Sequence, residues 1–187
     1  YASQNWGVGL FAHAADNGDL LWKVDRNDIR FRDSSPIEND GALYLLAEPH
    51  LFVLEAQTGE VLRKKELKGV KSTATPLIAG DLILCGTSNS GLVALDLKSL
   101  EEVWSFLPGE ALTPTIPYTQ KPSRGFEAAP VLSGGTVYIG GLDGIFYGLD
   151  LASGKPQWQC ELGAPILGPA AIAGNGVYVA DFSGNVY

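Results

Sequence analysis

A short pattern recurs four times along the chain, and this recurrence limits the possible folds more than any other feature of the sequence. Each copy has a segment of small residues that ends in proline, then a turn with glycine, then an apolar run. The four prolines are Pro36, Pro76, Pro130 and Pro169, with a longer interval between the second and the third. A self-similar period of roughly 40 residues is typical of stacked supersecondary units. We therefore expect a repeat protein.

Each unit contains several short apolar runs rich in Val, Ile, Leu and Tyr, separated by turns with Gly, Asn or Asp. Examples are the runs at 82–84 and 137–139, which are followed by further runs at 91–96 and 145–150. Runs of this length and composition are typical of strands joined as hairpins. No stretch of about eleven residues shows the three-and-four spacing of an amphipathic helix. The sequence therefore predicts units of four antiparallel strands.

A tryptophan follows the third apolar run in most units. Trp22, Trp104 and Trp158 each come after a short polar turn, and Arg63 takes the corresponding place in the second unit. A four-stranded sheet cannot bury both of its faces alone, so such units pack face to face around an axis. We predict that the three tryptophans are structural docking residues that fill the gaps between neighbouring units.

The recurring pattern Ala-x-Asp-x-x-Thr-Gly-x-x-x-Trp resembles the tryptophan-docking repeat of the pyrroloquinoline-quinone-like (quinoprotein-type) β-propellers. That superfamily includes the quinoprotein dehydrogenases and the outer-membrane assembly lipoprotein of Gram-negative bacteria. The matching residues fall into three copies: Ala94, Asp96, Ser99 and Trp104; Asp150, Ser153, Gly154 and Trp158; Ala12, Gly18 and Trp22. The resemblance covers the whole chain and implies an all-β propeller of four-stranded antiparallel blades, about four of which are present.

The repeats divide the chain into five predicted segments. Residues 1–30 form a partial blade, residues 31–68, 69–107 and 108–162 form whole blades, and residues 163–187 form a second partial blade. Propellers of the type resembled usually have eight blades, so we expect this chain to be part of an eight-bladed ring. The remaining blades could come from the same polypeptide or from a second copy, or one copy could close as a four-bladed ring. We favour a longer polypeptide, because both ends fall inside predicted strands.

The acidic composition narrows the classes of partner. The formal net charge is −8 at pH 7, whereas a nucleic-acid-binding domain needs a basic stripe or patch. We therefore expect no nucleic-acid binding. No run of about 18 apolar residues occurs, so we also expect no transmembrane segment. The family resemblance implies a periplasmic or extracellular location in a bacterium.

One break in the repeat marks a candidate binding region. The docking positions are evenly spaced as far as Trp104, whereas Trp158 follows after a longer interval, with the surplus in segment 108–126. Long loops on regular scaffolds often carry function. The candidate ligand-binding or partner-binding residues, here and near residue 30, combine cations with aromatic rings, as interfaces do. They are Arg30, Arg32, Tyr118, Lys121, Arg124 and Phe126. Alternatively, the cations only balance acidic neighbours on a solvated face.

Signals for metal binding or catalysis are weak. Cys85 and Cys160 lie far apart, in different units of the repeat, and we predict both to be small buried hydrophobic residues. His13 and His50 have no zinc-ligand spacing, and no serine lies in a nucleophile-elbow frame. We predict no catalytic, metal or cofactor-binding residue in the chain.

Two functional classes remain. The first is a noncatalytic binding or scaffolding module, part of a longer extracytoplasmic bacterial protein, with a protein or carbohydrate ligand. The alternative is a fragment of a pyrroloquinoline-quinone-dependent oxidoreductase, for which the resemblance implies a bound quinone with calcium. Trp6, Asp33 and Glu127 are the residues that could contribute to such a site, although ordinary solvated loops account for both acidic residues.

Overall fold

The fold is described from a computed structural model of the 187-residue chain, for residues 2–3, 9–25, 29, 34–68, 74–112 and 123–187. Within these ranges the chain contains seventeen β-strands and no helix. The strands form five antiparallel sheets that follow one another in chain order. We call these sheets the first to the fifth blade.

The bounds of the strands show three complete blades between two smaller sheets. The first blade contains β1 (Ala2–Ser3), β2 (Leu10–His13) and β3 (Leu20–Val24). The second contains β4 (Ile37–Asn39), β5 (Ala42–Ala47), β6 (His50–Glu55) and β7 (Val61–Glu66). The third contains β8 (Leu77–Ala79), β9 (Leu82–Thr87), β10 (Gly91–Asp96) and β11 (Glu102–Phe106). The fourth contains β12 (Val131–Ser133), β13 (Thr136–Gly140), β14 (Ile145–Asp150) and β15 (Pro156–Glu161). The fifth contains β16 (Ala171–Ala173) and β17 (Gly176–Tyr178).

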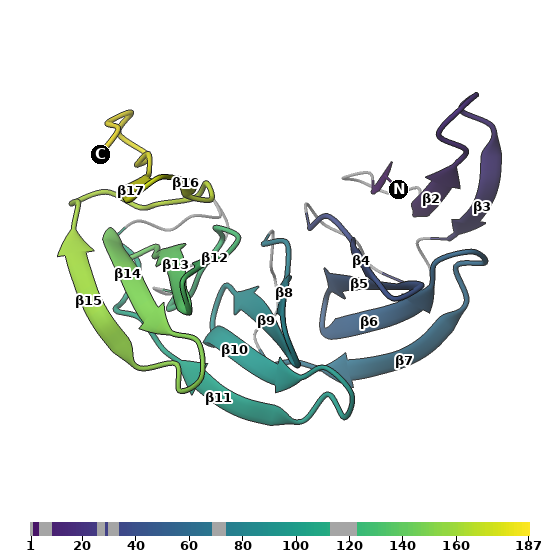
Figure 1. Cartoon of the computed structure of the whole chain (residues 1–187), viewed down its shortest axis with the longest axis horizontal. Coiled ribbons are helices and arrows are strands. Elements are labelled where there is room, and N and C mark those ends of the chain that lie inside the picture. Colours follow the sequence, from purple (N-terminus) through teal and green to yellow (C-terminus); the bar gives the residue numbers. More distant parts are fainter. Residues whose placement is uncertain (1, 4–8, 26–28, 30–33, 69–73, 113–122) are drawn as a thin grey trace.

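The blades are arranged as an open arc (Figure 1). The first strands β4, β8 and β12 lie towards the centre of the arc, and the fourth strands β7, β11 and β15 form its outer rim. Each blade is a meander in which sequential strands pair, because only short turns connect them. This is the all-β propeller of four-stranded antiparallel blades that the repeat predicts, with about four blades present. Strands β4–β7, β8–β11 and β12–β15 lie within the predicted segments 31–68, 69–107 and 108–162.

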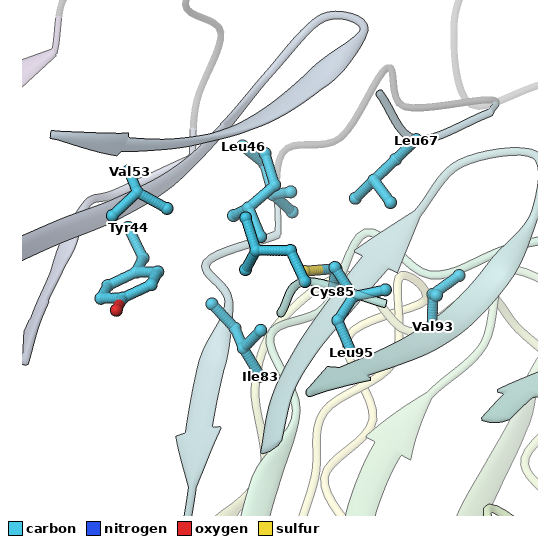
Figure 2. Packing of buried hydrophobic residues seen from close by; sticks show 10 residues of the cluster. Tyr44, Leu46, Val53, Leu67, Ile83, Cys85, Val93 and Leu95 are labelled. Atoms are coloured by element: carbon cyan, nitrogen blue, oxygen red, sulfur yellow. The ribbon is translucent and has the colours of Figure 1, made fainter. Parts of the chain in front are cut away.

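The hydrophobic core lies between the blades. Between the second and third blades, Leu46 and Leu51 meet Ile83 and Cys85 in a cluster of ten buried residues. Figure 2 shows side chains from the two sheets pointing towards one another. Similar clusters fill the other three gaps between successive blades. Fully burying one such aliphatic side chain contributes roughly 1.5–3 kcal/mol, so each blade depends on its neighbours for stability.

A tryptophan bridges two of these interfaces in the same way. The indole N–H of Trp22 donates to the carbonyl of Ala56 in the second blade at 3.1 Å. Between the third and fourth blades, Trp104 donates to the carbonyl of Leu151 at 3.0 Å. Each ring covers a glycine of the next blade, Gly59 or Gly154, where a β-carbon would overlap the ring. Both glycines also have positive φ, so the turn and the ring require the same residue.

Arg63 makes the equivalent connection between the second and third blades. Its guanidinium donates to the carbonyls of Leu97 and Lys98, and Leu97 corresponds in position to Ala56 and Leu151. The position equivalent to the two glycines holds Leu100, which keeps the positive φ (59°) and is buried. An arginine stem is narrower than an indole ring, so we infer that Arg63 leaves room for the buried Leu100 where a tryptophan requires glycine. We therefore expect the two departures from the repeat to be structurally coupled.

The residue that lies opposite the docking side chain, on the neighbouring strand of the same blade, also differs between tryptophan and arginine. Trp22 and Trp104 lie opposite alanines, and Trp158 lies opposite Gly148. Arg63, in contrast, lies opposite Val53. At Gly148 a β-carbon would overlap the Trp158 ring. We infer that an indole ring favours a small residue opposite it, whereas the arginine stem tolerates a branched one.

The Asp-x-x-Ser part of the repeat forms the turn before the docking residue. Asp96 Oδ1 accepts hydrogen bonds from the N–H and hydroxyl of Ser99 at 2.7 and 2.8 Å. Asp150 accepts the same pair from Ser153 at 2.9 and 2.6 Å. The hydrogen bonds from Ser99 hold the pKa of Asp96 below its usual range. The motif residues are thus engaged in turn formation and blade packing.

Substituting Gly154 will destabilise the protein more than substituting a glycine with similar φ in open space. In Gly154→Ala the new methyl group overlaps the Trp104 ring, whereas Gly134→Ala meets no atom within 4 Å. We expect Gly134→Ala to lose about 1 kcal/mol from the left-handed conformation alone. Gly154→Ala should lose roughly 1–3 kcal/mol more through overpacking. Urea unfolding of both variants measures the difference, and equal losses would contradict the docking of Trp104 on Gly154.

A double-mutant cycle will show that Arg63 and Leu100 are coupled. Arg63→Trp alone should lose roughly 1–3 kcal/mol, because the indole ring and the Leu100 side chain compete for one space. Leu100→Gly alone should also destabilise, because it removes a buried side chain. The double variant should be more stable than the sum of the two losses by about 1 kcal/mol or more. Additive free energies of unfolding would refute the coupling.

Candidate binding face

The two described ends of the segment between β11 and β12, residues 107–112 and 123–130, lie against the turns of two blades. The Gly91 N–H donates to the carbonyl of Arg124, and the Phe126 N–H donates to the carbonyl of Thr87. These two hydrogen bonds join the end of the segment to the third-blade turn. Leu112 and Leu142 link the segment to the fourth-blade turn: the Leu112 N–H donates to Leu142, and the Leu142 N–H donates to Gly125. We define the entrance face as the surface where turns between second and third strands meet the described connections between blades. In the third and fourth blades it comprises the turns 88–90 and 141–144 and the segments 107–112 and 123–130.

A buried carboxylate fixes the segment to the fourth blade. Asp143 is 9% exposed, and its Oδ2 accepts hydrogen bonds from the Gly109 N–H at 2.7 Å and the Tyr147 hydroxyl at 2.5 Å. Its Oδ1 accepts a hydrogen bond from the Ile145 N–H at 3.1 Å. A buried carboxylate needs such donors, because its charge would otherwise be uncompensated. Asp143 thus joins a turn, a strand and the segment that precedes β12.

The fifth blade repeats this carboxylate–tyrosine pair. The Tyr187 hydroxyl lies 3.0 Å from Asp181 Oδ2 and 3.3 Å from the carbonyl of Leu162, in the connection between the fourth and fifth blades. Asp181 also accepts hydrogen bonds from the N–H and side-chain amide of Asn185, and the side-chain bond lowers the pKa of Asp181 most. In both blades a tyrosine hydroxyl and an aspartate thus connect the residues that follow a turn to the connection that precedes the blade.

The pKa of Tyr147 is raised above its usual value near 10. Burial is the main cause, and the hydrogen bond to the carboxylate of Asp143 adds to it, because both favour the neutral phenol. Phe106 and Phe126 pack edge-on against the Tyr147 ring, with centroids 5.0 and 6.0 Å away. The entrance face therefore has a rigid base under the exposed side chain of Arg124.

The predicted binding residues divide into three groups. Arg124 is exposed on the entrance face, and its Nε donates to the Pro108 carbonyl at 3.0 Å. Phe126 is fully buried between the third and fourth blades, so in this conformation it is a packing residue with no surface for a ligand. Four candidates lie outside the described residues: Arg30, Arg32, Tyr118 and Lys121.

The predicted docking tryptophans also differ in their surroundings. Trp22 and Trp104 contact the following blade, as described above. Trp158 is 41% exposed and packs within its own blade, with ring centroids 5.8 Å from Tyr138 and 5.7 Å from Phe146.

The sequence did not single out Asp143 and Tyr147. Asp143 stands in a Gly-Gly-Leu-Asp-Gly segment, which is typical of an ordinary turn. A usable signal was the recurrence of an aspartate before a glycine and then a tyrosine, in Asp143 to Tyr147 and in Asp181 to Tyr187. Such a recurrence predicts a shared side-chain contact at the same place in two blades.

The cysteine prediction holds for one residue only. Cys85 is buried, and its burial raises the pKa of its thiol to about 12. Cys160 is exposed, so its prediction as a buried residue was wrong. Cys160 lies on the outer strand β15, all of whose side chains are exposed.

Among the residues that the structure describes, no three or more His, Cys, Asp or Glu side chains are grouped so as to hold a metal ion. Trp6 and Asp33 lie outside the described ranges, and Glu127 is half-buried. Within the same ranges, no helix has the length and hydrophobicity needed to cross a membrane.

The meandering blades and the docking side chains between them define a β-propeller built from quinoprotein-type repeats. The family model described as outer membrane protein assembly factor BamB matches residues 9–187. The chain therefore belongs to this BamB-like family of propellers.

The chain is similar to three known proteins. It is 27% identical over 187 residues to the serine/threonine-protein kinase AfsK of Streptomyces griseus, covering 95% of this chain and 22% of the kinase. It is 26% identical over 157 residues to the quinohemoprotein alcohol dehydrogenase ADH IIB of Pseudomonas putida, covering 75% of this chain and 21% of the dehydrogenase. The crystal structure of BamB from Moraxella catarrhalis matches with a TM-score of 0.70 and 25% identity, covering 96% of this chain and 54% of that chain. The chain thus spans about a fifth of the length of the two curated relatives.

The buried Tyr147, with its hydrogen bond to Asp143, will make the protein less stable as the pH rises above about 10. The folded protein holds Tyr147 neutral, because the pKa of Tyr147 is raised. The resulting contribution of Tyr147 to the free energy of unfolding is complete below about pH 10, the pKa of tyrosine in an unfolded chain. It is lost as the pH rises through the higher folded-state pKa. We expect the urea midpoint of Tyr147→Phe to fall less steeply than that of the wild type above about pH 10. Parallel curves from pH 8 upwards would contradict this assignment.

Proposed function

We propose that this chain is a noncatalytic protein-binding module that works outside the cytoplasm as part of a longer bacterial polypeptide. Membership of the BamB-like family over residues 9–187 carries the proposal. The matched family is described as an outer membrane protein assembly factor, and a noncatalytic binding module is consistent with that description. The small share of AfsK that the chain covers supports a propeller unit within a larger protein.

The binding surface that we propose is the entrance face around Arg124. The hydrogen bonds from Gly91, Phe126 and Leu142 fix the backbone there, and the aromatic rings beneath are buried. A preorganised backbone reduces the entropy that binding must overcome. The exposed guanidinium can then form charge-assisted hydrogen bonds with carboxylates of a partner.

Site-specific photo-crosslinking followed by direct binding will test this function. A benzophenone residue at Ser123, on the entrance face, should crosslink one envelope protein reproducibly. The same residue at Ser153, in a turn at the opposite end of the blade, should not. With the purified partner, Arg124→Glu should weaken binding roughly tenfold in calorimetry, because it reverses a central interface charge. Equal crosslinking from both positions would contradict the proposed surface.

The second candidate is a fragment of a quinone-dependent oxidoreductase, which the similarity to the quinohemoprotein alcohol dehydrogenase supports. Adding pyrroloquinoline quinone and calcium to the chain separates the two functions. Dye reduction with primary alcohols, together with a change in quinone absorbance, would overturn the noncatalytic assignment. We expect neither signal.

A further inference from the structure

The outer strand of the second blade concentrates the positive charge of an acidic protein. Five of the 13 Lys and Arg residues lie between positions 63 and 71, although the net charge is −8. Three of them belong to β7 itself: Arg63, Lys64 and Lys65. Arg63, Lys64 and the nearby Lys68 are exposed, and Lys65 is partly exposed.

In the described part of the chain, strand β7 is also an open edge of its sheet. It pairs with β6 on one side, and it lies on the outer rim of the arc in Figure 1. The ladder to β6 is regular from Arg63 to Glu66, where Val53, Phe52, Leu51 and His50 are the partners in turn. An unpaired strand edge offers a row of backbone donors and acceptors to another extended chain. The regular part of this edge coincides with the cations.

Protection of the edge against aggregation does not account for this charge. Lysine on an edge strand does discourage unwanted pairing. The corresponding outer strands β11 and β15 are also sheet edges, yet neither contains a Lys or Arg. Strand β3 has one cation, Lys23, which pairs with Asp25 at 3.2 Å. The fold therefore tolerates outer edges without cations, and β7 differs from them for another reason.

The cations lie on both faces of the edge strand. Side chains alternate along a strand, so Lys64 lies on the face opposite to that of Arg63 and Lys65. Lys65 forms an ion pair with the exposed carboxylate of Glu101, at 3.1 Å. The Arg63 guanidinium donates to backbone carbonyls of the third blade, which do not neutralise it. Glu66 ends the strand, so the unbalanced positive charge is centred on residues 63–65.

We propose that β7 is a strand-addition site for an extended acidic segment of a partner protein. The partner adds its backbone to the open edge and places consecutive acidic side chains opposite Arg63, Lys64 and Lys65, one after another on alternate faces. The exposed Val61 and Leu62, at the start of β7, select an apolar pair next to the acidic run. This surface rests on the proposed protein-binding function, and it is separate from the entrance face.

A labelled peptide provides the test. The probe is fluorescein-Thr-Glu-Glu-Glu-Val-Val-Thr-amide, which is complementary to β7 in the antiparallel direction used throughout the sheet. Fluorescence anisotropy in low salt should show saturable binding to the 187-residue chain. Raising the salt concentration to physiological levels should weaken it, because exposed charges are screened. Lys64→Glu/Lys65→Glu should weaken binding roughly tenfold or more through repulsion. A melting temperature equal to that of the wild type would show that this surface variant is folded.

Matched controls separate strand addition from general charge attraction. Lys23→Glu/Lys155→Glu changes the net charge by the same amount away from β7, and its affinity should stay within about twofold of the wild type. A peptide with N-methyl groups on alternate residues keeps the acidic side chains but loses backbone donors, so it should not bind. Bound wild-type peptide should also slow hydrogen exchange of amides within residues 61–66.

Several outcomes would overturn the site. These are no binding in low salt, equal affinity for the two double variants, and equal binding of the N-methylated peptide. Self-association of the chain through β7, seen in sedimentation and abolished by Lys64→Glu/Lys65→Glu, would identify a second copy as the occupant instead. Crosslinking at Ser123 and the quinone assay do not involve β7. A negative result with the peptide would therefore leave the proposed function standing, whereas failure of the proposed function would be detected by those two experiments.

Discussion

The structure depends on the burial of each blade face against the next. A four-stranded sheet of this size exposes two apolar faces, and the clusters around Leu46, Ile83, Leu84 and Leu149 exist only because a neighbouring sheet covers them. The docking contacts of Trp22, Arg63 and Trp104 add direction to this nonspecific burial. They fix how far one sheet slides over the next, because each donates a hydrogen bond to a particular carbonyl.

The entrance face inherits its rigidity from the same packing. Phe126 belongs to the core between the third and fourth blades, yet its N–H donates to the turn that carries the entrance face. Asp143 and Tyr147 continue this connection from the core to the segment before β12. The proposed binding residue Arg124 therefore lies two residues from Phe126, which is part of the core. The outer strand β7 lies on the rim of the arc in the second blade, away from these contacts of the third and fourth blades.

Sequence patterns predict the fold well because the repeat itself encodes it. The Asp-x-x-Ser turns, the tryptophans and the strand order follow from local spacing, and each recurs in phase. Arg63 stood out as a departure, but Leu100 did not, because the relation between them depends on how two blades pack. Phe126 looked like a surface aromatic, since its burial depends on how residues 123–126 pack against the third and fourth blades. The Gly109 and Leu162 partners of the carboxylate–tyrosine pairs, and the place of the β7 cations on an open edge, required knowledge of which turns meet and which strands form edges.

The replacement of a tryptophan–glycine contact by Arg63 and Leu100 has a consequence for assembly of the propeller. Chains made of similar repeats can misfold by pairing a repeat with the wrong neighbour, because the apolar faces are nearly interchangeable. Here a blade that presents Arg63 fits a successor with a bulky residue, whereas a blade that presents tryptophan fits only one with glycine. The second and third blades are thereby matched to each other and mismatched to the rest. A single exchanged contact gives this interface an identity and helps to specify the order of blades within the arc.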